Sequence, residues 1–392
     1  MMKHILLGIT GGIAAYKSCE IVRLLKKNQY AVTVAMTPKA TEFVGVATFQ
    51  ALSGRPVLLD THEAQNNGMA HINITREVDA FLIAPATANT IAKIANGLAD
   101  NVVTALAAAR ACPLIMAPAM NTQMWNNPAN LRNIQQLQQD GITILKPASG
   151  DLACGETGAG RMQEPADIVD LLADTLSPQI LKNKRILLTV GATFEPIDPV
   201  RGITNISTGR MGASLARACR AAGAKVTVIA GLMQVALPVG LTQVIQASSA
   251  QEMYRAVMEC IHEQDVFISV AAVADYRVAQ PSEQKIKKNS DHSSTTLILT
   301  ENPDILASVA QLPKAPFCVG FAAESENVLE YAKAKKQRKS IPMIIANQVS
   351  DAMGKEHNRI TILGPQDDEI RLPEMPKDEV ANAIVEYLSQ CL

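Results

Sequence analysis

Short apolar runs alternate with amphipathic stretches along the first half of the chain. The strand-like runs are residues 4–9, 31–36, 80–84 and 113–117, all rich in Ile, Leu, Val and Ala. Such runs without polar alternation are typical of strands buried on both faces of a parallel sheet. The helix-like stretches between them are residues 14–27, 39–52 and 88–109. This alternation predicts a doubly wound α/β sheet that binds its ligands at the carboxyl ends of the strands.

The same alternation restarts in the second half. Between residues 174 and 184 the pattern lapses into Asp-Thr-Leu-Ser-Pro-Gln-Ile-Leu-Lys-Asn-Lys, so we expect a domain boundary there, with domains over 1–180 and 183–392. The predicted elements that follow are strands at 185–190, 225–230, 266–270, 317–321 and 343–346 and a helix at 209–222. The polar segment 282–294 predicts a flexible loop or the tip of a hairpin. The predicted fold class is therefore two doubly wound, Rossmann-like α/β domains with mainly parallel sheets.

Composition and charge narrow the function classes. A chain of 392 residues, 48% of them hydrophobic, is long enough for two separate cores. The formal net charge of −1 argues against a nucleic-acid binder, and no apolar run reaches the length of a membrane span. The seven cysteines are scattered, with no Cys-x-x-Cys and no His-Glu-x-x-His spacing, which predicts free thiols in a reducing cytoplasm and identifies no metal ligands. Glycines interrupt the apolar start of the chain, so we expect no signal peptide.

Small residues follow the first three strands at the edge where ligands are expected. They are Thr10, Gly11 and Gly12 after the first strand, Thr37 after the second, and Ala86 and Asn89 after the third. The amides around the two glycines, with the dipole of the next helix, can hold a phosphate, and the alternative is a plain tight turn. Asn89 either contacts a flat ligand or caps a helix that starts near Thr90. Neither half contains G-x-G-x-x-G or a Walker motif, which disfavours NAD and a P-loop nucleotide site.

Three further side chains of the first half are candidates for catalysis: Asn121, His71 and Cys154. Asn121 follows a predicted strand, where its amide either hydrogen-bonds a substrate carboxylate or closes an Asx-turn. His71 is an isolated histidine, either an acid–base group or a structural residue. Cys154 lies in the stretch 149–162, whose four glycines predict a mobile loop that no packed strand would form. Such a loop is either a lid that carries a proton donor or a surface loop with an incidental cysteine.

Three stretches of the first half together resemble a known family. They are Gly-Ile-Thr-Gly-Gly-Ile-Ala-Ala-Tyr-Lys at 8–17, Pro-Ala-Met-Asn-x-x-Met-Trp at 118–125 and Ser-Gly-x-x-x-Cys-Gly-x-x-Gly-x-Gly-Arg-Met at 149–162. In this order they resemble the homo-oligomeric flavin-containing cysteine decarboxylases, and phosphopantothenoylcysteine decarboxylases in particular. The resemblance implies a flavodoxin-like domain that binds FMN at the small residues named above. It also implies His71 as the base, Asn121 as the group that orients the carboxylate and Cys154 as the proton donor.

The second half carries its own set of candidate stretches, at 191–212, 271–277, 285–288, 301–305 and 333–339. The amides at 207–212 can form an anion cradle before a helix, whereas a charge run such as 333–339 is by itself usually a solvated face. Together these stretches resemble phosphopantothenate–cysteine ligases. The resemblance implies CTP as cosubstrate with Mg²⁺ bridging its phosphates, Asn205 holding the acyl-cytidylate and Lys285 stabilising the departing pyrophosphate. The implied CTP contacts are Ala271, Asp275, Lys285, Asn302, Pro303, Asp304, Ile305, Phe321, Lys335 and Lys339.

The two resemblances cover nearly the whole chain and imply one bifunctional, cytoplasmic enzyme of coenzyme A biosynthesis. Its partners would be the small molecules 4'-phosphopantothenate, cysteine and CTP. The implied assembly is a homo-oligomer of trimeric decarboxylase and dimeric ligase units, a dodecamer being one such particle. Two alternatives are a flavin-binding regulatory module and a flavin-dependent partner in prenyl transfer or aromatic decarboxylation. The presence of both His71 and Cys154 speaks against the first, and the ligase-like half against the second.

Overall fold

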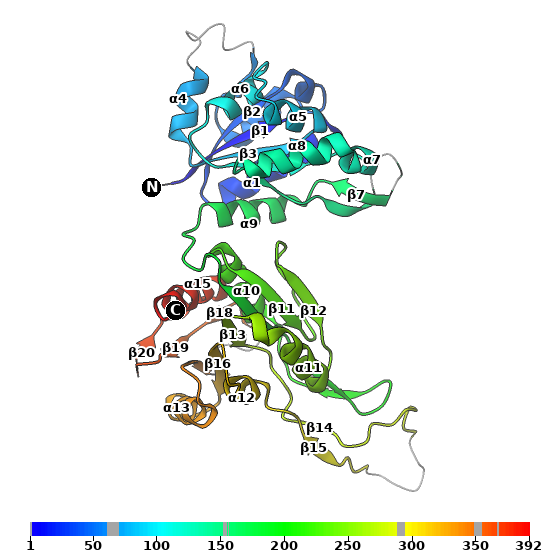
Figure 1. The fold of residues 1–392 in the computed structure, drawn as a ribbon, viewed down its shortest axis with the longest axis vertical. Coiled ribbons are helices and arrows are strands. Elements are labelled where there is room, and N and C mark those ends of the chain that lie inside the picture. The colour runs from blue at the N-terminus through cyan, green and yellow to red at the C-terminus, as the bar shows by residue number, and fades with distance from the viewer. Residues whose placement is uncertain are drawn as a thin grey trace. The chain divides into compact units, whose positions relative to one another are not determined.

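The computed structural model describes two units, Met1–Leu176 and Ser177–Leu392 (Figure 1). The described residues are 2–60, 70–151, 155, 157–287, 295–348, 355–366 and 368–392, without the side chains of residues 70–72 and 151. Each unit is built around its own sheet. Among the described residues, no helix combines the length and apolar character needed to cross a membrane.

The sheet of the first unit has five parallel strands in the order β2-β1-β3-β4-β5. Their bounds are β1 His4–Ile9, β2 Ala31–Met36, β3 Ala80–Ala86, β4 Leu114–Pro118 and β5 Thr143–Ile144. The order reverses between β1 and β3, as in flavodoxin-like folds, so the loops after these two strands diverge to opposite faces and open a crevice between them. The predicted α/β class is confirmed, and the crevice marks where a ligand is expected.

Helices cover both faces of this sheet. The helical elements are η1 Ile13–Tyr16, α1 Lys17–Lys27, η2 Pro38–Glu42, α2 Val46–Ser53, α4 Ala70–Glu77, α5 Ala88–Ala95, α6 Val102–Ala109, α7 Thr122–Asn126, α8 Pro128–Gln139 and α9 Pro165–Thr175. On one face, Ile21 of α1, Phe49 of α2 and Ile168 of α9 belong to one fully buried cluster with Leu7 of β1. On the other face, a second cluster joins α5, α6 and α8 to Phe81 of β3. The two apolar layers fix the strand ends in place.

Three predictions for the first unit are wrong in detail. The single helix expected over 39–52 is two elements, η2 and α2, with Gly45 as the N-cap of the second. The single helix expected over 88–109 is two helices, because Gly97 takes a left-handed φ of 70° and Asn101 starts α6 with a capping box. The glycine-rich stretch expected as a loop contains two paired strands, β6 Ala148–Asp151 and β7 Thr157–Arg161. Cys154, between them, lies outside the described residues.

The sheet of the second unit has eight strands in the order β12-β11-β8-β13-β16-β17-β19-β20. Their bounds are β8 Arg185–Val190, β11 Lys225–Ala230, β12 Gln243–Gln246, β13 Val266–Ser269, β16 Phe317–Glu324, β17 Met343–Gln348, β19 Ile360–Leu363 and β20 Glu369–Arg371. The first six are parallel, and β19 and β20 add antiparallel. Numbered along the chain, the parallel part runs 3-2-1-4-5-6, the doubly wound order with its reversal between β8 and β13.

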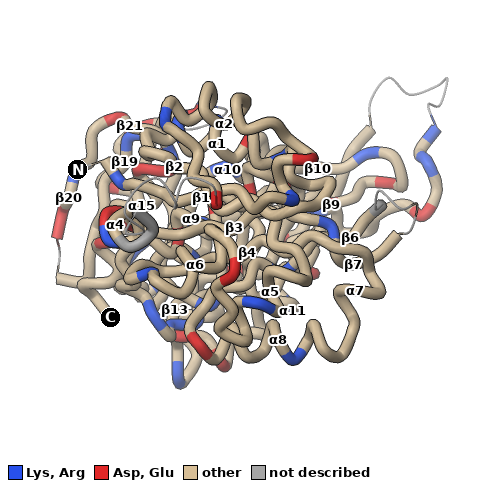
Figure 2. The backbone as a smooth tube through the Cα atoms, turned by 90° about the horizontal axis from the view of Figure 1, so that it is seen from above, with Lys and Arg blue, Asp and Glu red and all other residues tan. Residues whose placement is uncertain are grey.

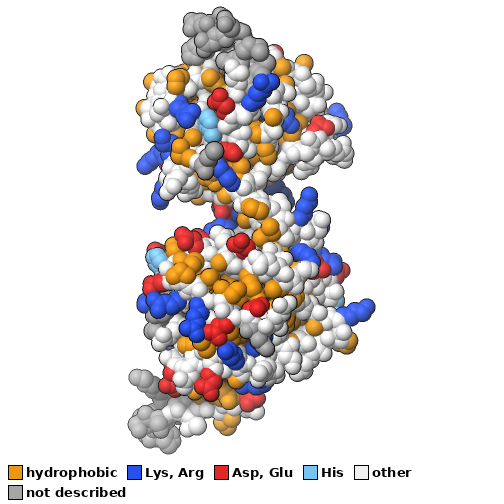
Figure 3. All heavy atoms as spheres, turned by 90° about the vertical axis from the view of Figure 1, so that its left-hand side faces the viewer, with side chains coloured by type: hydrophobic (Ala, Val, Ile, Leu, Met, Phe, Trp, Pro, Cys, Tyr) orange, Lys and Arg blue, Asp and Glu red, His pale blue; other side chains and the backbone are white. Residues whose placement is uncertain are grey.

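Two helical layers and three small antiparallel strand pairs complete the second unit. The helical elements are α10 Arg210–Ala221, α11 Ala250–Cys260, η3 Ile261–Glu263, α12 Ile305–Ala310, α13 Val328–Lys339 and α15 Lys377–Gln390. The antiparallel pairs are β9 Phe194–Pro196 with β10 Gly202–Thr204, β14 Tyr276–Val278 with β15 Leu299–Glu301, and β18 His357–Asn358 with β21 Met375–Pro376. The predicted polar segment 282–294 thus connects two paired strands. Basic and acidic residues are interspersed along the tube in Figure 2, and charged and hydrophobic side chains mix on the face in Figure 3.

Candidate functional site

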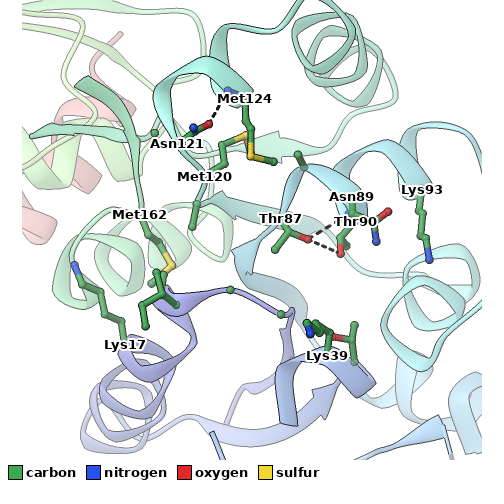
Figure 4. Close-up of a pocket in the computed structure, with 18 of the residues that line it drawn as sticks. Lys17, Lys39, Thr87, Asn89, Thr90, Lys93, Met120, Asn121, Met124 and Met162 are labelled. Atoms are coloured by element: carbon green, nitrogen blue, oxygen red, sulfur yellow. Dashed lines mark hydrogen bonds between the residues drawn. The ribbon is translucent and has the colours of Figure 1, made fainter. Parts of the chain in front are cut away.

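A cavity of about 1050 Å³ opens at the carboxyl ends of β1, β3 and β4 (Figure 4). Its size lies at the upper end of the range for small-molecule and cofactor sites. Of the residues expected to bind a cofactor, Gly11, Gly12, Thr37 and Asn89 line it, and so does Asn121. The crevice predicted from the strand order therefore exists, and the loops after β1, β2, β3 and β4 meet there.

Thr10 joins the two loops that diverge at the strand-order reversal. Its hydroxyl donates to the carbonyl of Pro85 (2.7 Å) and accepts from the amide of Thr87 (3.1 Å). Thr10 is 1% exposed and Ala86 is fully buried, so both lie behind the cavity wall. A Cβ on Gly11 would lie 2.9 Å from the backbone carbonyl carbon of Lys39, so glycine is needed where the loops after β1 and β2 meet.

Thr87, and not Asn89, caps α5. The Thr87 hydroxyl accepts from the amide of Thr90 (3.4 Å), which corrects the alternative in which Asn89 was the cap. Asn89 instead lies in the first turn and lines the cavity beside Ala88. The amides of Ala88 and Asn89 are first-turn donors without an intrahelical acceptor, so they can bind an anion there. Thr37 caps η2 through the amide of Ala40.

Asn121 combines a structural and a chemical role. Its Oδ1 accepts from the amide of Met124 at 2.8 Å and caps α7, as one of the two sequence interpretations expected. Within the part of the chain that the structure describes, its Nδ2 donates to no other group. Figure 4 shows the Asn121 side chain bonded to Met124 beside Met120. Capping and ligand binding are therefore compatible, because each uses a different atom of the amide.

The hairpin β6–β7 packs directly against the Asn121 loop. The amide of Met120 donates to the carbonyl of Gly160 at 3.0 Å. A Cβ on Gly160 would lie 2.3 Å from the Met120 carbonyl oxygen, and one on Gly158 would lie 2.4 Å from the Thr122 hydroxyl. The glycines thus permit a close approach of two backbones rather than a loose loop. The hairpin brings β7, which follows Cys154 in the chain, to the cavity edge, where Gly160 and Arg161 line the wall.

Replacing Gly160 by alanine is expected to move β7 away from Met120 and to lower at least tenfold the decarboxylation that the sequence resemblance implies. Gly160 has a φ of 131°, and its Cβ position overlaps the Met120 carbonyl, so the native contact cannot persist. Hydrogen exchange at the Met120 amide would become faster. Gly45→Ala is the matched control, because Gly45 has a φ of −66° and nothing lies within 4 Å of its Cβ position. Unchanged exchange at Met120 would contradict the expectation.

Every cationic side chain that lines the cavity is already paired among the described residues. The pairs are Lys17–Glu164, Lys39–Glu42, Lys93–Asp100 and Arg161–Glu164, at 2.9, 2.5, 2.6 and 2.6 Å. The Lys17 ammonium, together with Arg161, lowers the pKa of Glu164. An anionic ligand therefore meets backbone amides rather than a free cation. The sulfur-containing side chains of Met120, Met124 and Met162 add apolar, polarizable surface.

His71 lies in the first turn of α4, and its side chain is outside the described part of the chain. Its expected role as a base therefore stays a prediction, as does the role of Cys154. The sequence interpretation missed Thr87 and Lys17. Thr87 had a local signal, because a threonine directly before a predicted helix is a preferred N-cap residue. Lys17 had none, because its partner is 147 positions away.

In the second unit, the loops after β8 and β13 are tied together at the strand-order reversal. The amide of Ala274 donates to the Thr193 hydroxyl (3.0 Å), and Nδ2 of Asn205 donates to the carbonyl of Ala272 (3.0 Å). The side chain of Asn205 is thus fixed through Nδ2, and among the described residues its Oδ1 accepts no hydrogen bond. The sequence prediction placed both the 271–275 loop and Asn205 at the ligase site, and the structure brings them into contact.

The expected CTP contacts form two connected groups. In the first group, Asn302 is bonded to the loop before β14. Its backbone amide donates to Asp275 O and its Nδ2 donates to Ala274 O, both at 2.8 Å. Asn302 and Pro303 also line a hollow of about 540 Å³ with Arg277, which was not among the expected contacts. Ile305 is the first, buried residue of α12, and Ala271 follows β13.

The second group consists of Asp304, Phe321, Lys335 and Lys339. The Lys335 ammonium donates to Phe321 O (2.8 Å), and the Lys339 ammonium donates to Asp304 (2.9 Å). Burial, together with the charge of Lys339, lowers the pKa of Lys335. The two lysines are one turn apart on α13 and repel each other, so an anion placed between them would be stabilised.

Lys285 is exposed, and among the described residues its ammonium group has no partner. The next residue, Ile286, is however held in place. Its amide donates to Asp198 and its carbonyl oxygen accepts from Arg201, both in the β9–β10 turn. No group of three or more His, Cys, Asp or Glu side chains suited to a metal ion occurs among the described residues. A metal bridging the phosphates of a bound nucleotide needs no such cage, since Mg²⁺ is commonly held by one or two carboxylates and by phosphates.

The fold and the two sites define an α/β protein of the flavoprotein class with a second, doubly wound unit. Residues 1–177 match the family model described as Flavoprotein, and residues 181–392 match the model described as DNA/pantothenate metabolism flavoprotein C-terminal domain. The coenzyme A biosynthesis bifunctional protein CoaBC of Vibrio parahaemolyticus is 45% identical over 397 residues, covering 100% of this chain and 98% of the relative. The chain belongs to this family of coenzyme A biosynthesis bifunctional proteins.

A more distant relative matches over nearly the whole chain, and a solved structure matches the second unit. The protein of the same name from Bacillus subtilis strain 168 is 39% identical, covering 99% of this chain and 97% of the relative. A crystal structure of the C-terminal domain of a CoaBC protein is 34% identical, with a TM-score of 0.47, covering 54% of this chain and 97% of that one. The two family models and the full-length relatives confirm the family predicted from the three sequence stretches of the first half and from the second half.

Proposed function

We propose that this chain catalyses two consecutive steps of coenzyme A biosynthesis. The second unit joins cysteine to 4'-phosphopantothenate with CTP, through an acyl-cytidylate, and the first unit removes the cysteine-derived carboxylate to give 4'-phosphopantetheine. Full-length relatives named as coenzyme A biosynthesis bifunctional proteins support the two activities together. The structural observation that carries the proposal is the cavity at the β1/β3 reversal, with the Asn121 amide at its wall.

The residues of this cavity fit FMN. The first-turn amides of Ala88 and Asn89 suit its phosphate, and a Cβ on Gly12 would meet only Thr87 at 3.6 Å, so this loop leaves room for a ligand against the backbone. The methionine side chains offer apolar surface to a ring. Bound FMN supplies the electron sink for decarboxylation, which amino-acid side chains do not provide.

The protein groups of the first unit orient the substrate and move protons. Nδ2 of Asn121 donates to the substrate carboxylate. The bond from the Met124 amide to Oδ1 keeps the Asn121 side-chain amide in this orientation. His71 acts as the base and Cys154 returns a proton to the product. The hairpin β6–β7, whose connecting segment contains Cys154 in the sequence, packs against the Asn121 loop through the bond from the Met120 amide to Gly160 O.

The protein groups of the second unit bind and polarise CTP. Lys335 and Lys339 bind its phosphates with Mg²⁺, and Asn302, Pro303, Asp304 and Ile305 with Asp275, Ala271 and Phe321 surround the nucleotide. The free oxygen of Asn205 holds the acyl-cytidylate while the cysteine amine attacks. Lys285 stabilises the pyrophosphate as it leaves, because phosphoryl-type transition states spread negative charge over several oxygens.

The assembly and the location belong to the same proposal. We propose a homo-oligomer built from trimeric first units and dimeric second units. A cytoplasmic location is supported by the scattered cysteines, six of which are free among the described residues. The substrates are small molecules, so no macromolecular partner is needed for turnover.

A two-product assay tests the function. Purified protein is incubated with 4'-phosphopantothenate, cysteine and CTP, and pyrophosphate and CO₂ are measured together. We expect both products, a yellow protein, and CO₂ alone when phosphopantothenoylcysteine is supplied without CTP. Colourless protein that takes up no FMN would overturn the assignment of the first unit, and absence of CTP-dependent pyrophosphate would overturn that of the second.

A further inference from the structure

The segment Ser282–Lys287, called here the Lys285 strap, is bound to the β9–β10 turn. The amide of Ser282 donates to Ile197 O (2.9 Å), the amide of Ile286 donates to Oδ2 of Asp198 (3.1 Å), and Nη2 of Arg201 donates to Ile286 O (2.8 Å). Ser282 also ties the strap to itself, since its hydroxyl donates to Gln284 O (2.6 Å). Lys285 lies between two fixed residues while its own ammonium group stays exposed.

Asp198 is the centre of this network. Its side chain is 0% exposed. Oδ1 accepts from the amides of Val200 (2.9 Å) and Arg201 (2.8 Å), and Oδ2 accepts from Nε of Arg201 (3.1 Å), from its Nη2 (2.5 Å) and from the amide of Ile286. The Arg201 guanidinium holds the pKa of Asp198 well below its usual range. The carboxylate is thus ionised at neutral pH, with both oxygens bonded.

Closure of the turn does not by itself require Asp198. The amide of Ile197 donates to Arg201 O (2.8 Å), and β9 pairs with β10 over three residue pairs. Oδ2 instead reaches Ile286, 88 positions away along the chain. A lysine on an untied segment would lose conformational entropy each time it met a ligand, and a segment fixed beforehand removes that cost.

We propose that Asp198 is a positioning residue of the ligase reaction, which holds the Lys285 strap so that the Lys285 ammonium is placed for the departing pyrophosphate. The proposal rests on the proposed function of the second unit. Asp198 does not touch substrate, because its two oxygens are taken by Val200, Arg201 and Ile286. Its effect passes through Lys285 alone.

Asp198→Asn tests the proposal with two readouts in the full-length holoenzyme. Pyrophosphate release is expected to fall at least tenfold in kcat with an unchanged KM for CTP. In a Lys285→Gln background the same substitution is expected to cause no further loss, because two residues that act through one step are not additive. Independently of activity, trypsin is expected to cut after Lys285 several times faster, relative to the exposed Lys314, because the Lys285–Ile286 peptide is no longer bonded to a carboxylate.

Two further variants guard against a mere folding defect. Asp265→Asn removes a carboxylate that likewise accepts a backbone amide, that of Arg185 (2.7 Å), but at the amino ends of the strands, and should change neither readout. Ile286→Pro removes the strap's donor and leaves Asp198 intact, and it should lower pyrophosphate release as Asp198→Asn does. CO₂ release from phosphopantothenoylcysteine should stay normal in all variants.

Each result decides between the claims. Faster cutting with normal pyrophosphate release would overturn the positioning role and leave the ligase function standing. An additive loss in the Lys285→Gln background would also overturn it, because Asp198 would then act by another route. If the unsubstituted protein released no pyrophosphate at all, the ligase function itself would fail and the positioning role with it.

Discussion

Replacing Lys285 by glutamine is expected to lower CTP-dependent pyrophosphate release by about 10²–10³-fold, the usual cost of removing one charge-stabilising donor from a transition state. The Lys285 ammonium has no partner among the described residues, while the strap around it is fixed to Asp198 and Arg201. A free charge on a fixed segment is what stabilisation of a leaving group requires. Glutamine keeps the length of most of the side chain and removes the charge. The measurement is the kcat of pyrophosphate release.

Lys287→Gln is the matched control, because Lys287 is an exposed lysine two residues further along the same strap. It should retain pyrophosphate release within about threefold, because we expect Lys285, and not the other exposed lysine of the strap, to meet the departing group. Both variants should decarboxylate phosphopantothenoylcysteine normally, because that reaction belongs to the other unit. Equal losses in the two variants would mean that general positive potential, and not Lys285, assists the reaction.

The central strands were predictable almost to the residue. The runs 4–9, 31–36, 185–190 and 225–230 coincide with β1, β2, β8 and β11. These strands are buried on both faces, so their sequences are mostly apolar without regular polar alternation and carry a strong local signal. The antiparallel strands β19 and β20 and the hairpin β9–β10 were not predicted, because strands of three or four residues are too short to carry such a signal.

The interpretation of glycine was the main error in the fold. A cluster of four glycines indicated a mobile loop, yet Gly158 and Gly160 belong to β7. They are required where the hairpin meets Met120 and Thr122, which are far away along the chain and invisible to a local pattern. Sequence reasoning thus recognised that something unusual occurs at this stretch and assigned it the wrong physical cause.

In the candidate site too, residues with a local sequence signal were found and residues that depend on distant contacts were missed. Residues that follow strands, such as Gly11, Gly12 and Asn121, were found from the order of elements and line the cavity. Groups that act through distant partners were missed, as with Asp198 and Ile286 or Lys17 and Glu164. Those pairings depend on the packing of separate loops, which no spacing in the sequence reveals.

Replacing Asn121 by aspartate is expected to lower decarboxylation by about 10²–10³-fold while leaving α7 intact. Aspartate caps a helix as well as asparagine does, so the bond from the Met124 amide is kept. The change exchanges an N–H donor for a negative oxygen at the cavity wall, where the substrate carboxylate is then repelled rather than bound. The measurement is CO₂ release from phosphopantothenoylcysteine, with bound FMN followed by its absorbance.

Asn127→Asp separates this effect from capping and from added charge. Asn127 caps the neighbouring helix α8 through the amide of Ala129 (2.9 Å), and the same exchange there should leave CO₂ release unchanged. If Asn121→Asp decarboxylated normally, the amide nitrogen would have no role in the reaction, and the only function of Asn121 would be to start α7. If CO₂ release were lost together with FMN, Asn121 would serve the cofactor and not the carboxylate. Loss of CO₂ release with FMN retained is the outcome that the geometry of Oδ1 and Nδ2 predicts.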